Sequence, residues 1–352
     1  MLNYLFLLIV AFCTSLLAGP LARMLGRRLA IMDHPDELGM HSCSTPRSGG
    51  IGIGMAIWIS LEVCWLLPGI IISNRQLAAM GIGCFGLFVT GLLDDLHEIK
   101  PAIKALGLFG TGLMVMLVSR HITLLGFERI DFLLGILALV ASANAMNFLD
   151  GMDGLATGLA TLAGLGFLGM GILLGDTVLA CWAAVLAGSA GGFWPSNKPP
   201  ARIFMGDSGS LVIGGILGWL LLLLAAHGPV FLLAGLILLS WLVLDAGLAI
   251  IRRIVLRRDI FTGDRRHVYD LLYRSCNSVW KTILIMYLFQ LLFGLLVVSL
   301  LYLPWFVPAG LALSLWLGIL AWMIRLGMFS PLESHVSTAN GEAKRWAREI
   351  EE

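Results

Sequence analysis

Long apolar segments constrain this chain more than any other feature of its sequence. A bilayer core about 30 Å thick needs about 20 apolar residues per helix, and the 352-residue sequence contains eleven runs of roughly that length. They lie at 2–22, 49–72, 77–93, 105–119, 130–147, 156–174, 177–194, 209–226, 229–251, 281–303 and 306–326. The sequence therefore predicts an all-α, polytopic integral membrane protein with about eleven transmembrane helices, ten being the alternative count.

The composition agrees with a surface that mostly faces lipid. Hydrophobic residues make up 59% of the chain and charged residues 13%, whereas soluble domains average about 45–50% and about 25%. The 23 basic and 22 acidic residues nearly balance, so the chain lacks the basic excess of a nucleic-acid-binding protein. These figures exclude a soluble domain, a disordered chain and a nucleic-acid partner.

Basic residues predict the orientation, because cytosolic loops of membrane proteins are enriched in Lys and Arg. With the N-terminus outside, 20 of the 23 basic residues fall on the cytosolic side, and only Arg75, Arg120 and Arg129 fall outside. We therefore expect one transmembrane domain, 1–326, followed by a cytosolic tail, 327–352. Its cytosolic loops are predicted at 23–48, 94–104, 148–155, 195–208 and 252–280.

Five acidic residues lie against apolar helices rather than in charged surface segments. An ionised group at the centre of a membrane helix costs about 2.5–3.5 kcal/mol, so such residues usually line a cavity or bind a cation. All five fall at the cytosolic ends of predicted spans: Asp94, Asp95, Asp150, Asp153 and Asp207. Their position predicts a site on the cytosolic face.

The fifth predicted span ends in a regular pattern of polar residues. Asn144, Asn147 and Asp150 are three residues apart and so share one helix face. Gly151 and Gly154 follow, where glycine can end the helix and let the backbone approach a ligand. The alternative interpretation is an ordinary polar helix end with a glycine cap.

The eighth predicted span begins with Gly206-Asp207-Ser208-Gly209-Ser210. Free backbone amides at a helix N-terminus suit phosphate oxygens, and the Asp207 carboxylate suits a hard cation. The alternative is N-capping by Asp207 or Ser208. Nearby basic residues are Lys100, Lys104, Lys198 and Arg202. Carboxylates for a metal and cations for the remaining phosphate charge are what a magnesium diphosphate requires.

Several motifs together resemble one known family. In chain order they are Asp33-His-Pro35, the His41–Gly50 segment HSCSTPRSGG, Asp94-Asp95 with Lys104, the Asn144–Ala156 segment NAMNFLDGMDGLA, the Phe204–Ser210 segment FMGDSGS, and Asp264-Arg-Arg-His267. The sequence resembles the polyprenyl-phosphate N-acetylhexosamine-1-phosphate transferases over nearly the whole chain. This group includes undecaprenyl-phosphate N-acetylglucosamine-1-phosphate transferase and phospho-N-acetylmuramoyl-pentapeptide transferase.

The resemblance implies a multi-pass enzyme of a bacterial-type cell membrane, with its active site on the cytosolic face. Such an enzyme moves a sugar 1-phosphate from a UDP-N-acetylhexosamine to a polyprenyl (undecaprenyl) phosphate and releases UMP. It implies Mg²⁺ as the cofactor, with Mn²⁺ as a substitute, and a homodimer as the assembly.

The resemblance also implies roles for particular residues. Those implied as catalytic are Asp94, Asp95, Asp207 and His267. Those implied to contact substrate are Lys104, Asn144, Asn147, Asp150, Asp153, His41, Arg47, Arg265 and Arg266. Those implied as metal ligands are Asp207, Asp150 and Asp94.

Two sequence details bear on the substrate. The last family motif commonly reads His-x-His-His, whereas this chain has His267-Val-Tyr269-Asp270. The resemblance implies that this loop helps to hold the sugar donor. The Thr45-Pro-Arg-Ser-Gly-Gly50 form is closer to the branch that initiates O-antigens and other surface polysaccharides than to the peptidoglycan enzyme.

Two alternatives remain open at this point. One is the peptidoglycan lipid I synthase within the same family. The other is a cation- or proton-coupled transporter, which would place acids near the middle of spans. Only Glu62 and Asp245 come close to such positions, and this favours a one-sided active site.

Overall fold

The structure is a computed structural model that describes residues 1–33, 44–68, 70, 72–119, 122–257 and 266–329. Its elements, in chain order, are α1 (Leu2–Arg28), β1 (Met32–Asp33), β2 (Thr45–Pro46), α2 (Gly49–Leu66), α3 (Asn74–His97), α4 (Pro101–Ser119), α5 (Glu128–Leu149), α6 (Leu155–Leu174), α7 (Thr177–Asn197), α8 (Gly206–Ala225), α9 (Pro229–Leu238), α10 (Ser240–Val255), α11 (Val268–Cys276), α12 (Val279–Ser299) and α13 (Phe306–Arg325). β1 and β2 form one short antiparallel pair beside the N-terminus of α2. The predicted all-α class is therefore confirmed.

The number of membrane-crossing helices also agrees with the sequence. Among the described residues, ten helices are long and apolar enough to span a bilayer, and α9 with α10 makes an eleventh if the bent pair counts as one span. Each of the eleven predicted runs overlaps one of these helices. The chain is a multi-pass membrane protein.

Several helices continue beyond their apolar runs into segments predicted as loops. α3 extends to His97, α4 begins at Pro101 and α8 begins at Gly206, so the predicted loops 94–104 and 195–208 are partly helical. Hydrophobicity marks only the part of a helix that lies in lipid, whereas backbone hydrogen bonding continues for a turn or more beyond it. The carboxylates of Asp94 and Asp95 are thus held on a helix.

The ninth apolar run is a broken helix. α9 and α10 meet at an angle of 79°. Polar side chains satisfy the backbone at this break: Gln290 Nε2 donates to the Leu238 carbonyl at 2.9 Å, and Ser240 Oγ donates to the Ile237 carbonyl at 2.6 Å. Trp316 Nε1 donates to Ser240 Oγ at 2.9 Å. Gln290 and Trp316 belong to α12 and α13. The hydrophobicity of residues 229–251 alone therefore does not predict the bend.

α10 turns its polar side chains toward the protein. Asp245, Arg252 and Arg253 are buried, while Ile251 and Ile254 on the opposite side are at least half exposed. This is the inverse of a soluble amphipathic helix, and it suits a helix with lipid on one side. The short α11 follows it in chain order and packs against α12.

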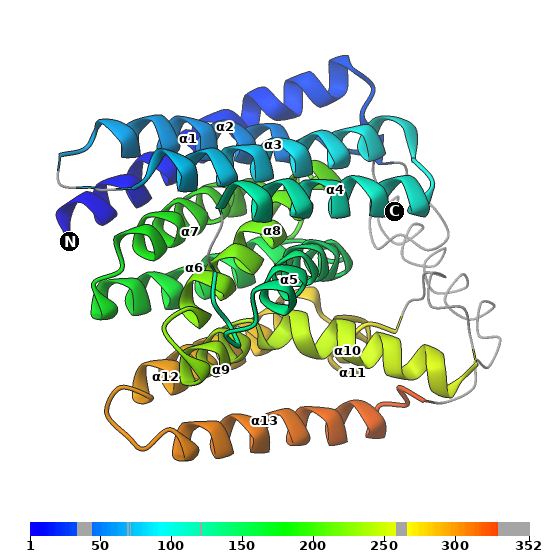
Figure 1. The fold of residues 1–352 in the computed structure, drawn as a ribbon. Helices are drawn as coiled ribbons and strands as arrows, with labels where there is room; N and C mark the ends of the chain where they lie inside the picture. Colours follow the sequence, from blue (N-terminus) through cyan, green and yellow to red (C-terminus); the bar gives the residue numbers. More distant parts are fainter. Residues whose placement is uncertain (34–43, 69, 71, 120–121, 258–265, 330–352) are drawn as a thin grey trace.

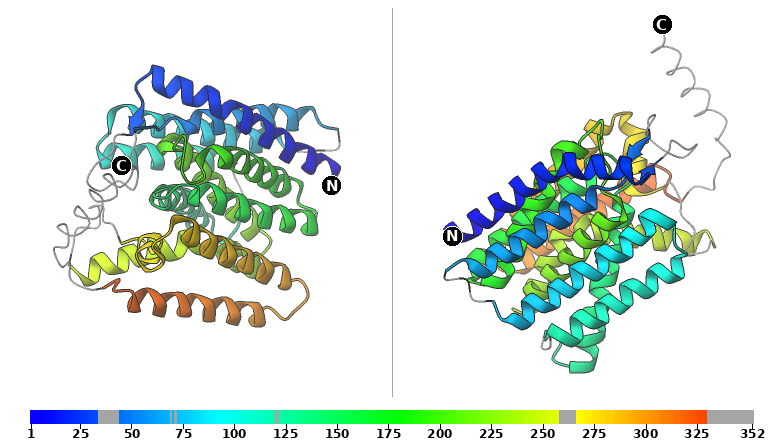
Figure 2. Two further views of the ribbon diagram at one scale, coloured as in Figure 1. Left: turned by 180° about the vertical axis from the view of Figure 1, so that it is seen from behind. Right: turned by 90° about the horizontal axis from the view of Figure 1, so that it is seen from above.

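α8 lies at the centre of the bundle. All twenty of its residues are buried, and it packs against α2, α3, α5, α7 and α9. The outer helices instead expose large apolar side chains, as at Leu288 and Leu295 on α12 and Leu317 on α13. α13 lies at one edge of the molecule, and α5 crosses the bundle so steeply that it is seen nearly end-on (Figures 1 and 2).

Glycines allow the helices around α8 to approach closely. A Cβ at Gly91 of α3 would lie 2.4 Å from the Asp207 backbone, and one at Gly50 of α2 would lie 2.4 Å from the Gly209 nitrogen. A Cβ at Gly192 of α7 would lie 2.2 Å from the Phe12 carbonyl oxygen of α1. Small residues at such crossings are typical of helix packing in membranes.

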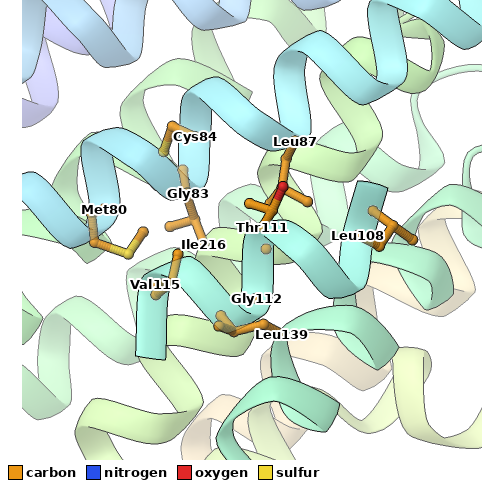
Figure 3. A pocket seen from close by; sticks show the side chains of 11 residues that line it. Met80, Gly83, Cys84, Leu87, Leu108, Thr111, Gly112, Val115, Leu139 and Ile216 are labelled. Atoms are coloured by element: carbon orange, nitrogen blue, oxygen red, sulfur yellow. The ribbon is translucent and has the colours of Figure 1, made fainter. Parts of the chain in front are cut away.

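One small gap remains among α3, α4, α5 and α8 (Figure 3). It has a volume of about 10 Å³ and is lined mainly by apolar side chains, including Cys84, Leu87, Val115 and Ile216. Such a gap is at the lower limit for one water molecule and has almost no polar partners for it. It is a packing defect rather than a binding site.

The crossing of α3 and α8 can be tested with Gly91→Ala. The added methyl group must displace the backbone of α8, and overpacking of this kind costs about 1–3 kcal/mol. We expect a lower midpoint of thermal unfolding in detergent. Gly110→Ala on α4 is the matched control, because nothing lies within 4 Å of a Cβ at that position. Equal unfolding midpoints for the two variants would contradict the close packing of α3 on α8.

Candidate active site

The ends of four helices meet at the side chain of Lys104. Lys104 is in the first turn of α4. Its Nζ lies 3.0 Å from Asp94 Oδ2 of α3 and 3.2 Å from Asn147 Oδ1 of α5. It also contacts Asp207 Oδ2 of α8. Asn147 Nδ2 donates to Asp207 Oδ1 at 2.9 Å and to Ser210 Oγ at 3.0 Å. One ammonium group thus joins three oxygen-bearing side chains from three other helices.

Asp95 has a different position from its neighbour Asp94. Its carboxylate accepts hydrogen bonds from Asp207 N at 2.8 Å, from Ser208 N at 2.9 Å and from Ser208 Oγ at 2.7 Å. The Asp95 side chain is completely buried. It caps the N-terminus of α8 from another helix, where the helix dipole favours a negative charge. The expectation of free amides at Asp207 and Ser208 for a substrate phosphate is therefore wrong, because Asp95 occupies both.

Gly206, the first residue of α8, is required by its surroundings. Its φ of +70° lies in the left-handed region, and a Cβ there would lie 2.6 Å from the Arg47 carbonyl oxygen and 2.8 Å from Asp95 Oδ2. Glycine is the residue that fits both the backbone angle and the close approach. The Gly206-Asp207 step therefore sets the direction of the Asp207 side chain.

Arg47 supplies a second positive charge at this point. Its guanidinium lies 3.5 Å from Asp207 Oδ1, 3.8 Å from Asp95 Oδ1 and 3.7 Å from Asp33 Oδ1. Burial alone would lower the pKa of the Arg47 guanidinium, but the carboxylates of Asp95 and Asp207 outweigh it and raise this pKa above its ordinary value. The guanidinium therefore stays charged.

The loop before α8 is fixed by its backbone. Phe204 N donates to the Pro46 carbonyl at 2.8 Å, and Gly49 N donates to the Phe204 carbonyl at 2.9 Å. Ala201 N donates to Asp153 Oδ2 at 2.8 Å. Asp153 thus holds the loop that leads to Asp207, and the Thr45–Gly50 segment lies against the same loop.

Asp150 follows α5 and has no hydrogen bond or ion pair with its side chain in the part of the chain that the structure describes. Burial raises the pKa of its half-buried carboxyl group well above the ordinary value, and the negative charge of Asp207 adds to this increase. Asn144 likewise makes no side-chain hydrogen bond with the described residues. Of the polar residues predicted to share one face, Asn147 is the one that joins the Lys104 cluster.

His267 lies at the N-terminus of α11 and pairs with Asp245 of α10. Its Nδ1 is 2.7 Å from Asp245 Oδ2, and Val268 N donates to Asp245 Oδ1 at 2.7 Å. The His267 ring stacks on Tyr269 with an interplanar angle of 4°, and its centroid lies 5.8 Å from the centroid of Phe148 on α5. The Asp245 carboxylate and the stacked ring of Tyr269 thus hold the imidazole in one orientation.

The two residues that depart from the family's histidine motif both hold this loop in place. Tyr269 Oη donates to the Phe148 carbonyl at 3.4 Å and packs so closely that a Cβ at Gly151 would lie 1.9 Å from its hydroxyl oxygen. His267 N donates to Asp270 Oδ2 at 3.1 Å. Tyr269 therefore fixes α11 against the end of α5, and Asp270 caps the N-terminus of α11.

The predicted site residues fall into separate groups. Asp94, Lys104, Asn147, Asp207 and Arg47 lie together, while Asp95 and Asp153 hold the start of α8 and its preceding loop. Arg266 accepts a hydrogen bond from Arg252 at its backbone carbonyl. His41 and Arg265 lie outside the described residues.

Sequence reasoning missed the contributions of Asp245, Ser208 and Ser210. The sequence does indicate a role for Asp245, because it is the only acidic residue in the apolar run 229–251. Ionisable residues in such runs are usually functional. Ser208 and Ser210 carried no signal beyond their place at a helix start. Their partners, Asp95 and Asn147, come from other helices.

The site offers oxygen donors to a metal, although the described side chains do not form a ready-made cage. Among the described residues, no group of three or more His, Cys, Asp or Glu side chains is placed to hold a metal ion. The oxygens of Asp94, Asn147 and Asp207 surround the Lys104 ammonium, and Asp150 has an unpaired carboxylate. Hard oxygen donors of this kind suit Mg²⁺.

Comparison with known proteins identifies a family. The family model for "Glycosyl transferase family 4" matches residues 77–225, which run from α3 to α8. The chain is 30% identical over 303 residues to a probable undecaprenyl-phosphate N-acetylglucosaminyl 1-phosphate transferase of Bacillus subtilis, covering 82% of each chain. It is 33% identical over 323 residues to the decaprenyl-phosphate N-acetylglucosaminephosphotransferase of Mycobacterium tuberculosis, covering 80% of this chain and 78% of the relative.

A further relative acts on a different sugar. The chain is 29% identical over 267 residues to a phospho-N-acetylmuramoyl-pentapeptide-transferase of Clostridium kluyveri, covering 68% of this chain and 82% of the relative. The family match covers the residues Asp94, Lys104, Asn147 and Asp207. The chain belongs to glycosyl transferase family 4 and is a phospho-sugar transferase of the membrane.

Proposed function

We propose that this protein transfers N-acetylglucosamine 1-phosphate from UDP-N-acetylglucosamine to a polyprenyl phosphate, giving polyprenyl-diphospho-N-acetylglucosamine and UMP. The relatives with 30% and 33% identity are named for this sugar and for undecaprenyl or decaprenyl phosphate. The observation that carries the proposal is the meeting of Asp94, Asn147 and Asp207 around Lys104 at one end of the bundle. That arrangement suits a charged diphosphate substrate beside a lipid surface.

The cations of the site suit the phosphates of the donor. A UDP-sugar brings two phosphates, and Lys104 and Arg47 are the two cations that contact Asp207. Charge-assisted hydrogen bonds from such groups to phosphate oxygens are about twice as strong as neutral ones. We assign both residues to binding the diphosphate, with Asn147 holding the Asp207 carboxylate in place.

The chemistry of the donor set fits Mg²⁺, and we propose Asp207, Asp150 and Asp94 as the residues that would hold it. Asp150 supports this assignment because its carboxylate is unpaired among the described residues and close enough to Asp207 for its pKa to rise. A bound Mg²⁺ would neutralise charge that develops on the phosphates. Mn²⁺ has similar oxygen-ligand chemistry.

The transfer needs no strong base. The acceptor is a phosphate monoester with a second pKa near about 6, so its oxygen is largely deprotonated at neutral pH. That oxygen attacks the sugar-bearing phosphorus, a new P–O bond forms, and the bond to the uridylyl phosphate oxygen breaks to release UMP. Positioning and charge stabilisation therefore supply most of the rate.

Within the aspartate pair, we assign the direct role to Asp94. Its side chain is 17% exposed, while that of Asp95 is fully buried at the start of α8. Asp94 can contact the lipid phosphate or the metal, and Asp95 acts by holding Asp207. A covalent aspartyl-phosphate at Asp94 is the alternative route.

We assign His267 to the sugar donor and Asp245 to the orientation of His267. A carboxylate at Nδ1 fixes the orientation of the ring, and the imidazolium form is the one that can donate from Nε2 to a substrate phosphate. The ring is further held by its stack on Tyr269 and its contact with Phe148. Asp245 is thus a positioning residue.

We also propose that the active site faces the cytosol and that the product starts a surface polysaccharide. The charge distribution of the loops supports this orientation. The Thr45–Gly50 segment supports the polysaccharide branch, and it packs directly against the loop before Asp207.

Purified protein tests the activity directly. With UDP-N-acetylglucosamine, undecaprenyl phosphate and Mg²⁺, we expect equal amounts of UMP and lipid-linked sugar, measured by chromatography of both products. UDP-N-acetylmuramoyl-pentapeptide is expected to give no product, and a chelator should abolish turnover until Mg²⁺ is restored. The absence of product from the first donor, with an acceptor shown to work for a known relative, would refute the proposed donor.

The division of roles between the two aspartates gives a second test. Asp94→Asn should lower kcat by about 100-fold or more and leave the unfolding midpoint nearly unchanged, since an amide oxygen can still bind Lys104. Asp95→Asn removes the charged cap of α8 and should also lower the stability, by about 1–3 kcal/mol. The measurements are kcat and thermal unfolding on the same preparations. The reverse pattern of stability would show that the two roles are exchanged.

The Asp245–His267 pair gives a third test, a double-mutant cycle. Asp245→Asn and His267→Ala should each lower kcat/KM, and the double variant should be no worse than His267→Ala, because Asp245 acts through the ring. His227→Ala is the matched control: His227 pairs with Asp176 at 2.9 Å, but it follows the far end of α8, about 30 Å from Asp207. Additive losses in the double variant would exclude the positioning role.

A further inference from the structure

A basic cavity lies outside the site described above, between the end of α1 and the loop before α8. It has a volume of about 380 Å³ and is lined by Gly19, Pro20, Arg23, Met24, Arg27, Arg28, Ser196, Arg202 and Ile203. Four of these nine residues are arginines and none is acidic. The walls come from two distant parts of the chain, so the charge concentration is a product of the fold.

Among the described residues, the four guanidinium groups have no anionic side chain paired with them. Within the part of the chain that the structure describes, none of Arg23, Arg27, Arg28 and Arg202 forms an ion pair or a side-chain hydrogen bond. Arg23 Nε is buried and has no hydrogen-bond acceptor there. Arg23 and Arg27 are also one helical turn apart, a spacing at which like charges repel. Arg27 and Arg28 are exposed, so the unmade hydrogen bond of the buried Arg23 Nε is the feature that calls for a ligand, and the gathered positive charge favours an anionic one.

The cavity lies where a phospholipid head group would be. α1 has 27 residues and is therefore about 40 Å long, longer than the about 30 Å hydrocarbon core. Its last turns lie at one end of the bundle (Figures 1 and 2), and the three charges that they carry, on Arg23, Arg27 and Arg28, favour a position outside the hydrocarbon core. This is the end of the molecule at which α2 and α8 begin, since Ser48 Oγ donates to the Ala22 carbonyl at 2.8 Å.

An apolar strip on α1 leads into the cavity. Leu17, Leu21 and Met24 lie on one side of the helix with exposed fractions of 76%, 39% and 42%, and Met24 is also part of the cavity wall. An acyl chain on this strip would bring its phosphate to the arginines. A soluble phosphate would use the arginines alone.

We propose that this cavity binds the phosphate group of an anionic phospholipid whose acyl chain lies along Leu17, Leu21 and Met24. Arg202 connects the bound head group to the active site, because it lies five residues before Asp207. Its neighbours in that loop are held by the Asp153 carboxylate and by the Pro46 carbonyl. A phosphate on Arg202 would therefore stabilise the loop that sets the start of α8.

Lipid binding to the full-length protein, measured by native mass spectrometry without turnover, tests this independently of the transferase activity. The protein should bind phosphatidylglycerol more tightly than phosphatidylcholine. Arg23→Gln/Arg202→Gln should weaken phosphatidylglycerol binding by about tenfold or more, since each basic residue near a lipid surface contributes about a fivefold change. The control Arg75→Gln/Arg325→Gln removes the same charge at two exposed positions outside the cavity and should bind as the unmodified protein does.

A single variant, Arg27→Gln, keeps the test informative if the double variant fails to fold, and it should weaken binding by about fivefold. Unchanged phosphatidylglycerol binding in the arginine variants, or equal binding of the two lipids by the unmodified protein, would overturn the proposal. Displacement of phosphatidylglycerol by an equal concentration of inorganic phosphate would also overturn it, because it would assign the cavity to a soluble phosphate.

Discussion

The ammonium group of Lys104 is the interaction on which the arrangement of the site depends. It reaches from α4 to oxygens of Asp94, Asn147 and Asp207 on α3, α5 and α8. Carboxylates surrounded by apolar helices are costly unless a cation compensates them. The ammonium of Lys104, together with the guanidinium of Arg47 beside Asp207, therefore makes it possible for two acidic side chains to lie together at the end of a membrane bundle.

At the start of α8, hydrogen bonds compensate the cost of burying a carboxylate. Asp95 is fully buried, yet its carboxylate accepts hydrogen bonds from two backbone amides and one hydroxyl group. The negative charges of the adjacent residues Asp94 and Asp95 are thus stabilised in two different ways. Asp94 pairs with the Lys104 ammonium, and Asp95 caps the N-terminus of α8. Because each carboxylate has its own stabilising partner, the two neighbouring charges can both contribute to one site.

Much of the fold could be predicted from the sequence, because spans in lipid must be long and apolar, and eleven such runs correspond to helices. The site was predicted less completely. Asp94, Lys104 and Asp207 could be found from their types and positions, but the role of Asp95 depends on the crossing of α3 and α8 at Gly91. The bend after Leu238 depends on Gln290, which is more than 50 residues further along the chain. Such contacts leave no local pattern.

The complete burial of α8 has a consequence for the membranes in which this protein can work. A bilayer that is thicker or thinner than a helix acts on the protein by tilting or distorting the helices that it touches. No residue of α8 is exposed to lipid, so differences in bilayer thickness act first on outer helices such as α12 and α13. The carboxylate of Asp207, at the tip of α8, is thereby shielded from changes in the thickness of the bilayer.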